Sequence, residues 1–96
     1  MGPGEREPYI REHIAGLAAD AFPDDVGPWR ILEITHRDGH SAVSFEEPPH
    51  SNPHASHRFR LILSFGTKPP PETVGGYEFD NQTQRWRLLF GVDPTK

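Results

Sequence analysis

Apolar residues in one early stretch of the chain recur every three or four positions. In residues 8–22, "PYIREHIAGLAADAF", these positions are Ile10, Ile14, Leu17, Ala18, Ala21 and Phe22. Such spacing places the side chains on one face of an α-helix. Pro8 suits the first position of a helix, where its missing N–H needs no partner. We therefore predict a helix over residues 8–22, ended by the "PDD" that follows.

Apolar and polar positions alternate through much of the remaining chain, which is the pattern of β-strands. Residues 57–65, "HRFRLILSF", show it best, because Phe59 and Leu61 face one way and Arg58 and Arg60 the other. Further strands are predicted at residues 28–36, 41–46, 75–80 and 85–92. The Asp-Gly pair at 38–39 is a strong turn signal, and it joins the first two strands as a hairpin.

The last two predicted strands flank a polar turn, "NQTQ", at residues 81–84. Residues 75–89, "GGYEFDNQTQRWRLL", resemble part of a kelch repeat, with paired glycines, a tyrosine, an aspartate turn and a tryptophan. The resemblance implies an aromatic hairpin closed by that turn. We expect its large side chains to face the core, namely Tyr77, Phe79, Trp86, Leu88 and Phe90.

One helix followed by five strands predicts an α+β fold. The helix would cover one face of an antiparallel sheet, and the other face would stay in water. This element order resembles that of the cystatin-like family. A small curled sheet or a partial barrel is the alternative. We expect a single domain over residues 8–92, with a flexible leader at 1–7 and a flexible tail at 93–96.

Composition narrows the class of protein. Hydrophobic residues make up 33% of the chain and aromatic residues 10%, which indicates an ordered domain. Cysteine is absent, which excludes disulfides, thiolate catalysis and cysteine-based metal sites and fits a cytoplasmic location. No apolar run approaches the roughly 20 residues of a membrane span. From residue 28 onward eight acids balance eight bases, so overall charge does not indicate nucleic-acid binding.

Histidines are concentrated between residues 36 and 57: His36, His40, His50, His54 and His57. The strand predicted at 41–46 places the first two at one end of the sheet and the last three at the other, roughly 17–20 Å away. They therefore do not form one metal site. A site made of His50, His54 and His57 is a minority alternative, since nearby prolines oppose the helix that would align them. We expect exposed loop histidines and no cofactor.

Arginines form the more coherent candidate site. Arg58 and Arg60 alternate outward from the third predicted strand, as Arg85 and Arg87 do from the fifth, with Arg30 and Lys68 beside them. We expect these arginines to share the solvent-exposed face, where guanidinium groups suit carboxylate or phosphate oxygens. Two proline-rich loops, containing Pro49, Pro53 and Pro70, are a second candidate surface.

Motifs of catalysis are missing from the sequence. There is no G-x-S-x-G nucleophile elbow and no P-loop, so we do not expect an enzyme. The main prediction is a small cytoplasmic module that binds another protein through the arginine face or the proline-rich loops. One alternative is an anion- or nucleic-acid-binding protein that uses the same face. Another is a metal-binding protein that uses the loop histidines.

Overall fold

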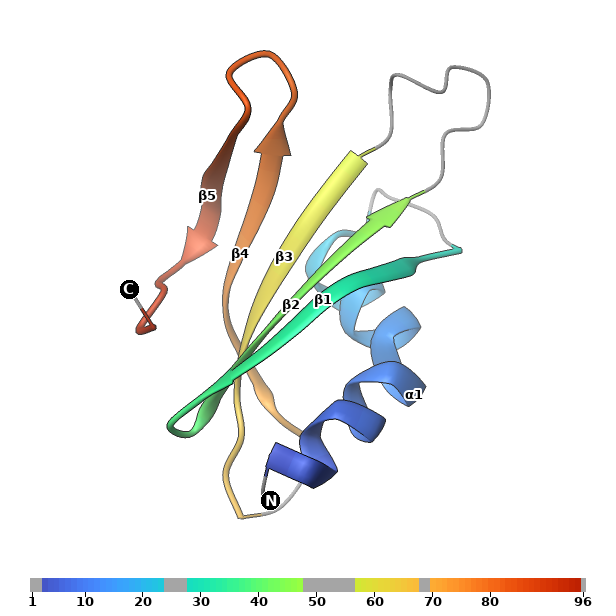
Figure 1. Ribbon diagram of the computed structural model, residues 1–96, viewed down its shortest axis with the longest axis vertical. Coiled ribbons are helices and arrows are strands. Elements are labelled where there is room, and N and C mark those ends of the chain that lie inside the picture. The colour runs from blue at the N-terminus through green and yellow to red at the C-terminus, as the bar shows by residue number, and fades with distance from the viewer. Residues whose placement is uncertain (1–2, 24–27, 48–56, 68–69, 96) are drawn as a thin grey trace.

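The computed structural model describes residues 3–23, 28–47, 57–67 and 70–95. It contains the helix α1 (Pro3–Ala21) and the strands β1 (Arg30–Arg37), β2 (His40–Glu47), β3 (His57–Ser64), β4 (Glu72–Asp80) and β5 (Arg85–Gly91). The strands form one antiparallel sheet in the order β1-β2-β3-β4-β5 (Figure 1). The predicted α+β architecture is confirmed, and the sheet is open rather than closed into a barrel.

Helix α1 lies across the sheet behind β1, β2 and β3 (Figure 1). We call the covered side the inner face and the opposite side the outer face. The core between helix and sheet consists of Ile10, Ala18, Phe22, Val43, Phe45, Phe59, Leu61, Leu63 and Phe65. These sheet residues come from β2, β3 and the residue after β3, and Ile31 and Ile34 of β1 pack against them. The helix therefore covers β1, β2 and β3 and leaves the inner side of β4 and β5 largely uncovered.

The helix begins at Pro3, and residues 3–7 therefore belong to it rather than to the predicted leader. Arg6 explains the earlier start, because its side chain is buried. Its guanidinium donates hydrogen bonds to the carbonyl oxygens of Arg37 (3.0 Å) and His40 (3.3 Å). It also lies 5.6 Å from the centre of the Phe65 ring. These contacts fix the start of α1 against the β1–β2 turn.

Strand pairing places the aromatic residues of β4 on the outer face. Tyr77 lies opposite Arg60, whereas its neighbour Glu78 lies opposite the core residue Phe59. Directly opposed residues of antiparallel strands share a face. Tyr77 is therefore on the side away from α1, and so is Phe79, two residues further along. The prediction that both face the core is wrong.

A bulge divides the apolar residues of β5 between the two faces. Trp86 pairs with Phe79, and Leu88 pairs with Tyr77, so both lie on the outer face. The pairing then shifts, because Phe90, not Leu89, lies opposite Gly76. Phe90 consequently points to the inner face, as predicted, and its ring centre is 6.0 Å from that of Phe22.

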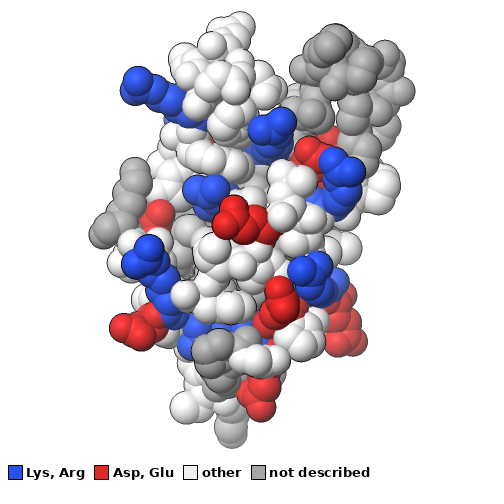
Figure 2. Space-filling model, in the orientation of Figure 1, with Lys and Arg blue, Asp and Glu red and all other residues white. Residues whose placement is uncertain are grey.

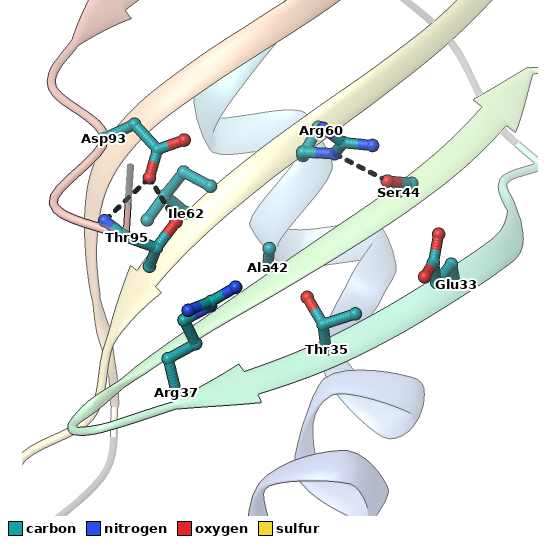
Figure 3. Close-up of a pocket in the computed structure, with 9 residues that line it drawn as sticks. All are labelled: Glu33, Thr35, Arg37, Ala42, Ser44, Arg60, Ile62, Asp93 and Thr95. Carbon is teal, nitrogen blue, oxygen red and sulfur yellow. Dashed lines mark hydrogen bonds between the residues drawn. The ribbon is translucent and has the colours of Figure 1, made fainter.

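Residues 93–95, predicted to be a flexible tail, are held against the outer face. The Tyr77 hydroxyl donates a 2.8 Å hydrogen bond to Asp93 Oδ2. The backbone N–H of Thr95 donates to Asp93 Oδ1 at 2.9 Å. The segment lies beside Ile62 of β3 (Figure 3), whose side chain is buried although it is on the outer face.

Candidate functional site

The predicted arginine face separates into two groups. Arg58 and Arg60 lie on the outer face, and Arg30, which pairs with Glu46 in the sheet, lies there too. Arg87 lies opposite Glu78, and Arg85 lies opposite Asp80. The strand pairing puts both on the inner side of β5. The expectation that all these arginines share one face is therefore wrong, because Trp86 and Leu88, which alternate with Arg85 and Arg87 along β5, lie on the outer face.

The two outer-face arginines of β3 stack on aromatic rings. The Cζ atom of Arg60 is 4.2 Å from the centre of the Trp86 ring, and its Nε donates a 2.9 Å hydrogen bond to Ser44. The Cζ atom of Arg58 is 5.1 Å from the centre of the Phe79 ring. Such cation–π contacts stabilise each guanidinium where it lies. One face of each of these two rings is therefore already in contact with an arginine.

Glu46 lies close to two of the outer-face arginines. This largely buried carboxylate forms an ion pair with Arg30, and its Oε2 lies 3.9 Å from Arg58 Nε. Figure 2 shows basic and acidic side chains interspersed on this face rather than gathered by sign. The outer face is therefore not a free basic patch.

A hollow of about 240 Å³ lies in the middle of the outer face. We call it the outer-face hollow. Its lining comes from β1, β2, β3 and the segment after β5 and consists of Glu33, Thr35, Arg37, Ala42, Ser44, Arg60, Ile62, Asp93 and Thr95 (Figure 3). Sequence reasoning missed this site. Its one local signal is that Glu33, Thr35 and Arg37 alternate along a strand.

The edge strand β5 carries an exposed apolar run. Leu88 is 44% exposed, Leu89 41%, Phe90 38% and Val92, just after the strand, 64%. Among the described residues no strand pairs with the free edge of β5. Arg85 and Arg87 lie at the start of the same strand and are also exposed. The edge strand β5 therefore combines apolar side chains with two arginines, of which Arg87 forms an exposed ion pair with Glu78 of β4 at 3.5 Å.

The loop candidates fall largely outside the described residues: Pro49, Pro53, His50, His54 and Lys68. Pro70 is described and exposed, and His57 is exposed at the start of β3. His36 and His40 lie at the β1–β2 hairpin, the opposite end of the sheet from His57. In the described ranges no three metal-ligating side chains gather.

One pair of side chains resembles a catalytic arrangement. His36 Nδ1 lies 2.8 Å from Ser41 Oγ. Ser41, however, is buried and lies opposite Leu63 on the inner face, so no substrate reaches its hydroxyl. The contact satisfies a buried polar group and does not form an active site.

Two groups have shifted pKa values, and neither suggests catalysis. Burial raises the pKa of the Tyr77 phenol, and the hydrogen bond to Asp93 adds to the effect. The backbone N–H of Gln82 donates to Asp80 and lowers the pKa of that carboxyl, with a further contribution from Thr83. Both shifts have local structural causes, namely the fixed C-terminal segment and the β4–β5 turn.

Comparison with protein-family models, with curated proteins and with solved structures finds no match for this chain. Within the described residues, no helix has the length and hydropathy needed to cross a membrane.

Proposed function

We propose that the protein is a small, non-enzymatic interaction module that binds an extended, acidic segment of another protein along the free edge of β5. The observation that carries the proposal is the apolar exposure of this edge strand, from Leu88 to Val92. An edge strand offers unpaired backbone N–H and C=O groups, and a partner strand can bind them by extending the sheet.

The two edges of the sheet differ in a way that favours β5. On β1, the charged residues Arg30, Glu33 and Arg37 are exposed, and the pairing is irregular at Leu32. Charges and bulges are devices that discourage strand addition. β5 also has a bulge, at Leu89, but its exposed residues from Leu88 onward are apolar. Strand addition at β5 removes this apolar surface from water, which is favourable.

Charge favours an acidic partner over a second copy of the chain. β5 contributes Arg85 and Arg87 and no acidic residue. Opposite charges across a strand pair stabilise it, and like charges destabilise it. Two copies paired edge to edge through β5 would place four arginines in one interface, with no acidic residue from either β5 strand to pair with them. An acidic segment instead gains cross-strand ion pairs.

The other predicted functions receive less support from the geometry. Nucleic-acid binding on the outer face is less favoured, because Arg58 and Arg60 stack on aromatic rings and Glu46 lies close to Arg58. The loop prolines and the loop histidines remain candidates without described geometry, except for Pro70 and His57. A cytoplasmic location remains part of the proposal and is supported by the absence of cysteine.

Synthetic peptides test the proposal. A β-forming peptide of about eight residues with glutamates at alternate positions is compared with its lysine counterpart and with a proline-interrupted version. We expect the acidic peptide to bind and to slow amide hydrogen exchange in β5. Replacing both Arg85 and Arg87 by Glu should weaken its binding by about tenfold and favour the lysine peptide instead.

Arg11→Glu is the matched control, because Arg11 is an exposed arginine on α1, far from the edge in sequence. It should leave binding unchanged. Equal binding of the acidic and basic peptides would overturn the proposal, as would protection that appears in β1 instead of β5.

A further inference from the structure

The outer-face hollow has balanced charge. Arg37 and Arg60 supply two positive groups, and Glu33 and Asp93 supply two negative groups. A simple anion in the hollow is repelled by the two carboxylates, and a simple cation is repelled by the two guanidinium groups. A ligand that carries both charges can face one group of each sign.

Only two of the four charged groups are available for a ligand. Arg60 is held by Ser44 and by the Trp86 ring. Asp93 accepts hydrogen bonds from Tyr77 and Thr95. In contrast, the side chains of Glu33 and Arg37, both exposed on β1, form no hydrogen bond or ion pair with any described residue.

The positions of Glu33 and Arg37 set the spacing of the two charges. They are four residues apart on β1, so their Cα atoms are separated by about 13 Å. The Arg37 side chain extends from the turn end toward Ala42 (Figure 3). The two side chains form no ion pair with each other, so a space remains between their charged groups that a ligand with well-separated charges can span.

The surface between these two charges is mixed. Ala42 lies opposite Thr35, midway between Glu33 and Arg37, and the hydroxyl-bearing Ser44 lies opposite Glu33. The methyl group of Ala42 offers one apolar contact to a short methylene chain there. The volume of about 240 Å³ is sufficient for a small ligand.

We propose that the outer-face hollow binds a small zwitterion of the ω-amino-acid class. Its carboxylate faces Arg37, its ammonium faces Glu33, and its methylene chain lies over Ala42. This site is distinct from the peptide edge of β5, and its ligand is of a different class.

NMR titration of the full chain tests the site with a graded set of probes. The zwitterions are glycine, 4-aminobutyrate and 6-aminohexanoate, and the single-charge analogues are butyrate and butylamine. We expect 4-aminobutyrate or 6-aminohexanoate to bind about tenfold more tightly than glycine or either analogue. The methyl signals of Ala42 and Thr35 should shift on binding.

Three variants assign the contacts. Arg37→Gln should weaken binding of the preferred zwitterion by about tenfold and leave binding of butylamine unchanged. Glu33→Gln should weaken binding of the same zwitterion by about tenfold and leave binding of butyrate unchanged. Ala42→Leu should abolish binding by filling the hollow. Arg11→Gln, on the exposed side of α1, is the control and should have no effect. Each variant's dispersed NMR spectrum shows that it is folded.

Several outcomes would overturn the proposal. Butyrate or butylamine binding as tightly as the zwitterions would show a simple ion site. Binding that survives Ala42→Leu in the folded variant, or shifts that map outside the hollow, would place the ligand elsewhere. The absence of any shift at tens of millimolar probe would show that the hollow binds no ligand of this class.

Discussion

Arg60 on β3 lies with its guanidinium 4.2 Å from the ring centre of Trp86 on β5, although β4 separates the two strands. The same side chain donates a hydrogen bond to Ser44 on β2. One arginine thus connects strands on both sides of its own. No part of α1 takes part in this contact, so it is a source of stability for the outer face that is independent of the core.

Replacing Arg60 by Lys should therefore destabilise the protein although the charge is kept. Lysine lacks the planar guanidinium that stacks on Trp86 and the Nε donor that reaches Ser44. We expect the free energy of unfolding to fall by about 1–2 kcal/mol, as measured by urea denaturation. Arg85→Lys is the control, and it should change stability by less than about 0.5 kcal/mol. Equal effects of the two substitutions would show that the stacking contributes nothing.

Tyr77 and Asp93 predict how stability changes in alkaline solution. The pKa of the Tyr77 phenol is raised in the fold, so the folded protein keeps this proton when the unfolded chain has lost it. The stabilisation is full below the ordinary pKa of about 10 and is lost as pH rises through the folded value. Asp93→Asn should lower the pKa of Tyr77, as measured by phenolate absorbance. Tyr77→Phe should remove this part of the alkaline loss of stability, and an unchanged alkaline profile in that variant would contradict the assignment.

Arg6→Gln should loosen the junction between α1 and the β1–β2 turn. It removes the guanidinium that donates to the carbonyl oxygens of Arg37 and His40. We expect a loss of about 1–3 kcal/mol in the free energy of unfolding and faster amide exchange at the turn. Arg11→Gln, which removes only an exposed pair with Glu7, should cost no more than about 0.5 kcal/mol. Similar losses in both variants would contradict a special role for Arg6.

Two adjacent glycines should respond differently to the same substitution. A Cβ atom on Gly75 would lie 2.2 Å from the backbone oxygen of Val92, whereas one on Gly76 would lie 2.4 Å from the Phe90 ring. The partly exposed ring can rotate away, but the backbone cannot move without disturbing the β4–β5 pairing. Gly75→Ala should therefore destabilise the protein more than Gly76→Ala, by about 1 kcal/mol or more in thermal unfolding. The reverse order would show that the strand is freer to shift than the ring.

Much of the fold could be predicted from the sequence because its strongest signals are local. The helical spacing of Ile10, Ala18 and Phe22, the alternation around Phe59 and the turn at Gly39 all lie within short stretches. Each pattern corresponds to an element of the structure, and the boundaries of most strands differ from the predicted ones by a few residues.

Which side chains of the last two strands face the helix could not be predicted, for two physical reasons. Helix α1 packs mainly on β1, β2 and β3, so large apolar residues on β4 do not need to face it. The bulge at Leu89 then shifts the alternation, and Trp86 and Phe90 fall on opposite faces although they are four positions apart. The residues of β4 and β5 carry no signal that indicates how much of the sheet the helix covers or where the bulge lies.

The outer-face hollow was equally hidden, since its walls come from four separate segments. The alternation of Glu33 and Arg37 is visible in the sequence, but the position of Asp93 depends on its contact with Tyr77. Contacts of this kind depend on the register of strands far apart in the chain.

The segment that holds Asp93 and Thr95 directly continues β5, and this continuity has a thermodynamic consequence. A local unfolding event that frees β5 from β4 also removes one wall of the hollow. A peptide bound along β5 lowers the population of that opened state, and so does a ligand bound in the hollow. Occupation of either surface therefore increases affinity at the other by the same factor, as reciprocal linkage requires.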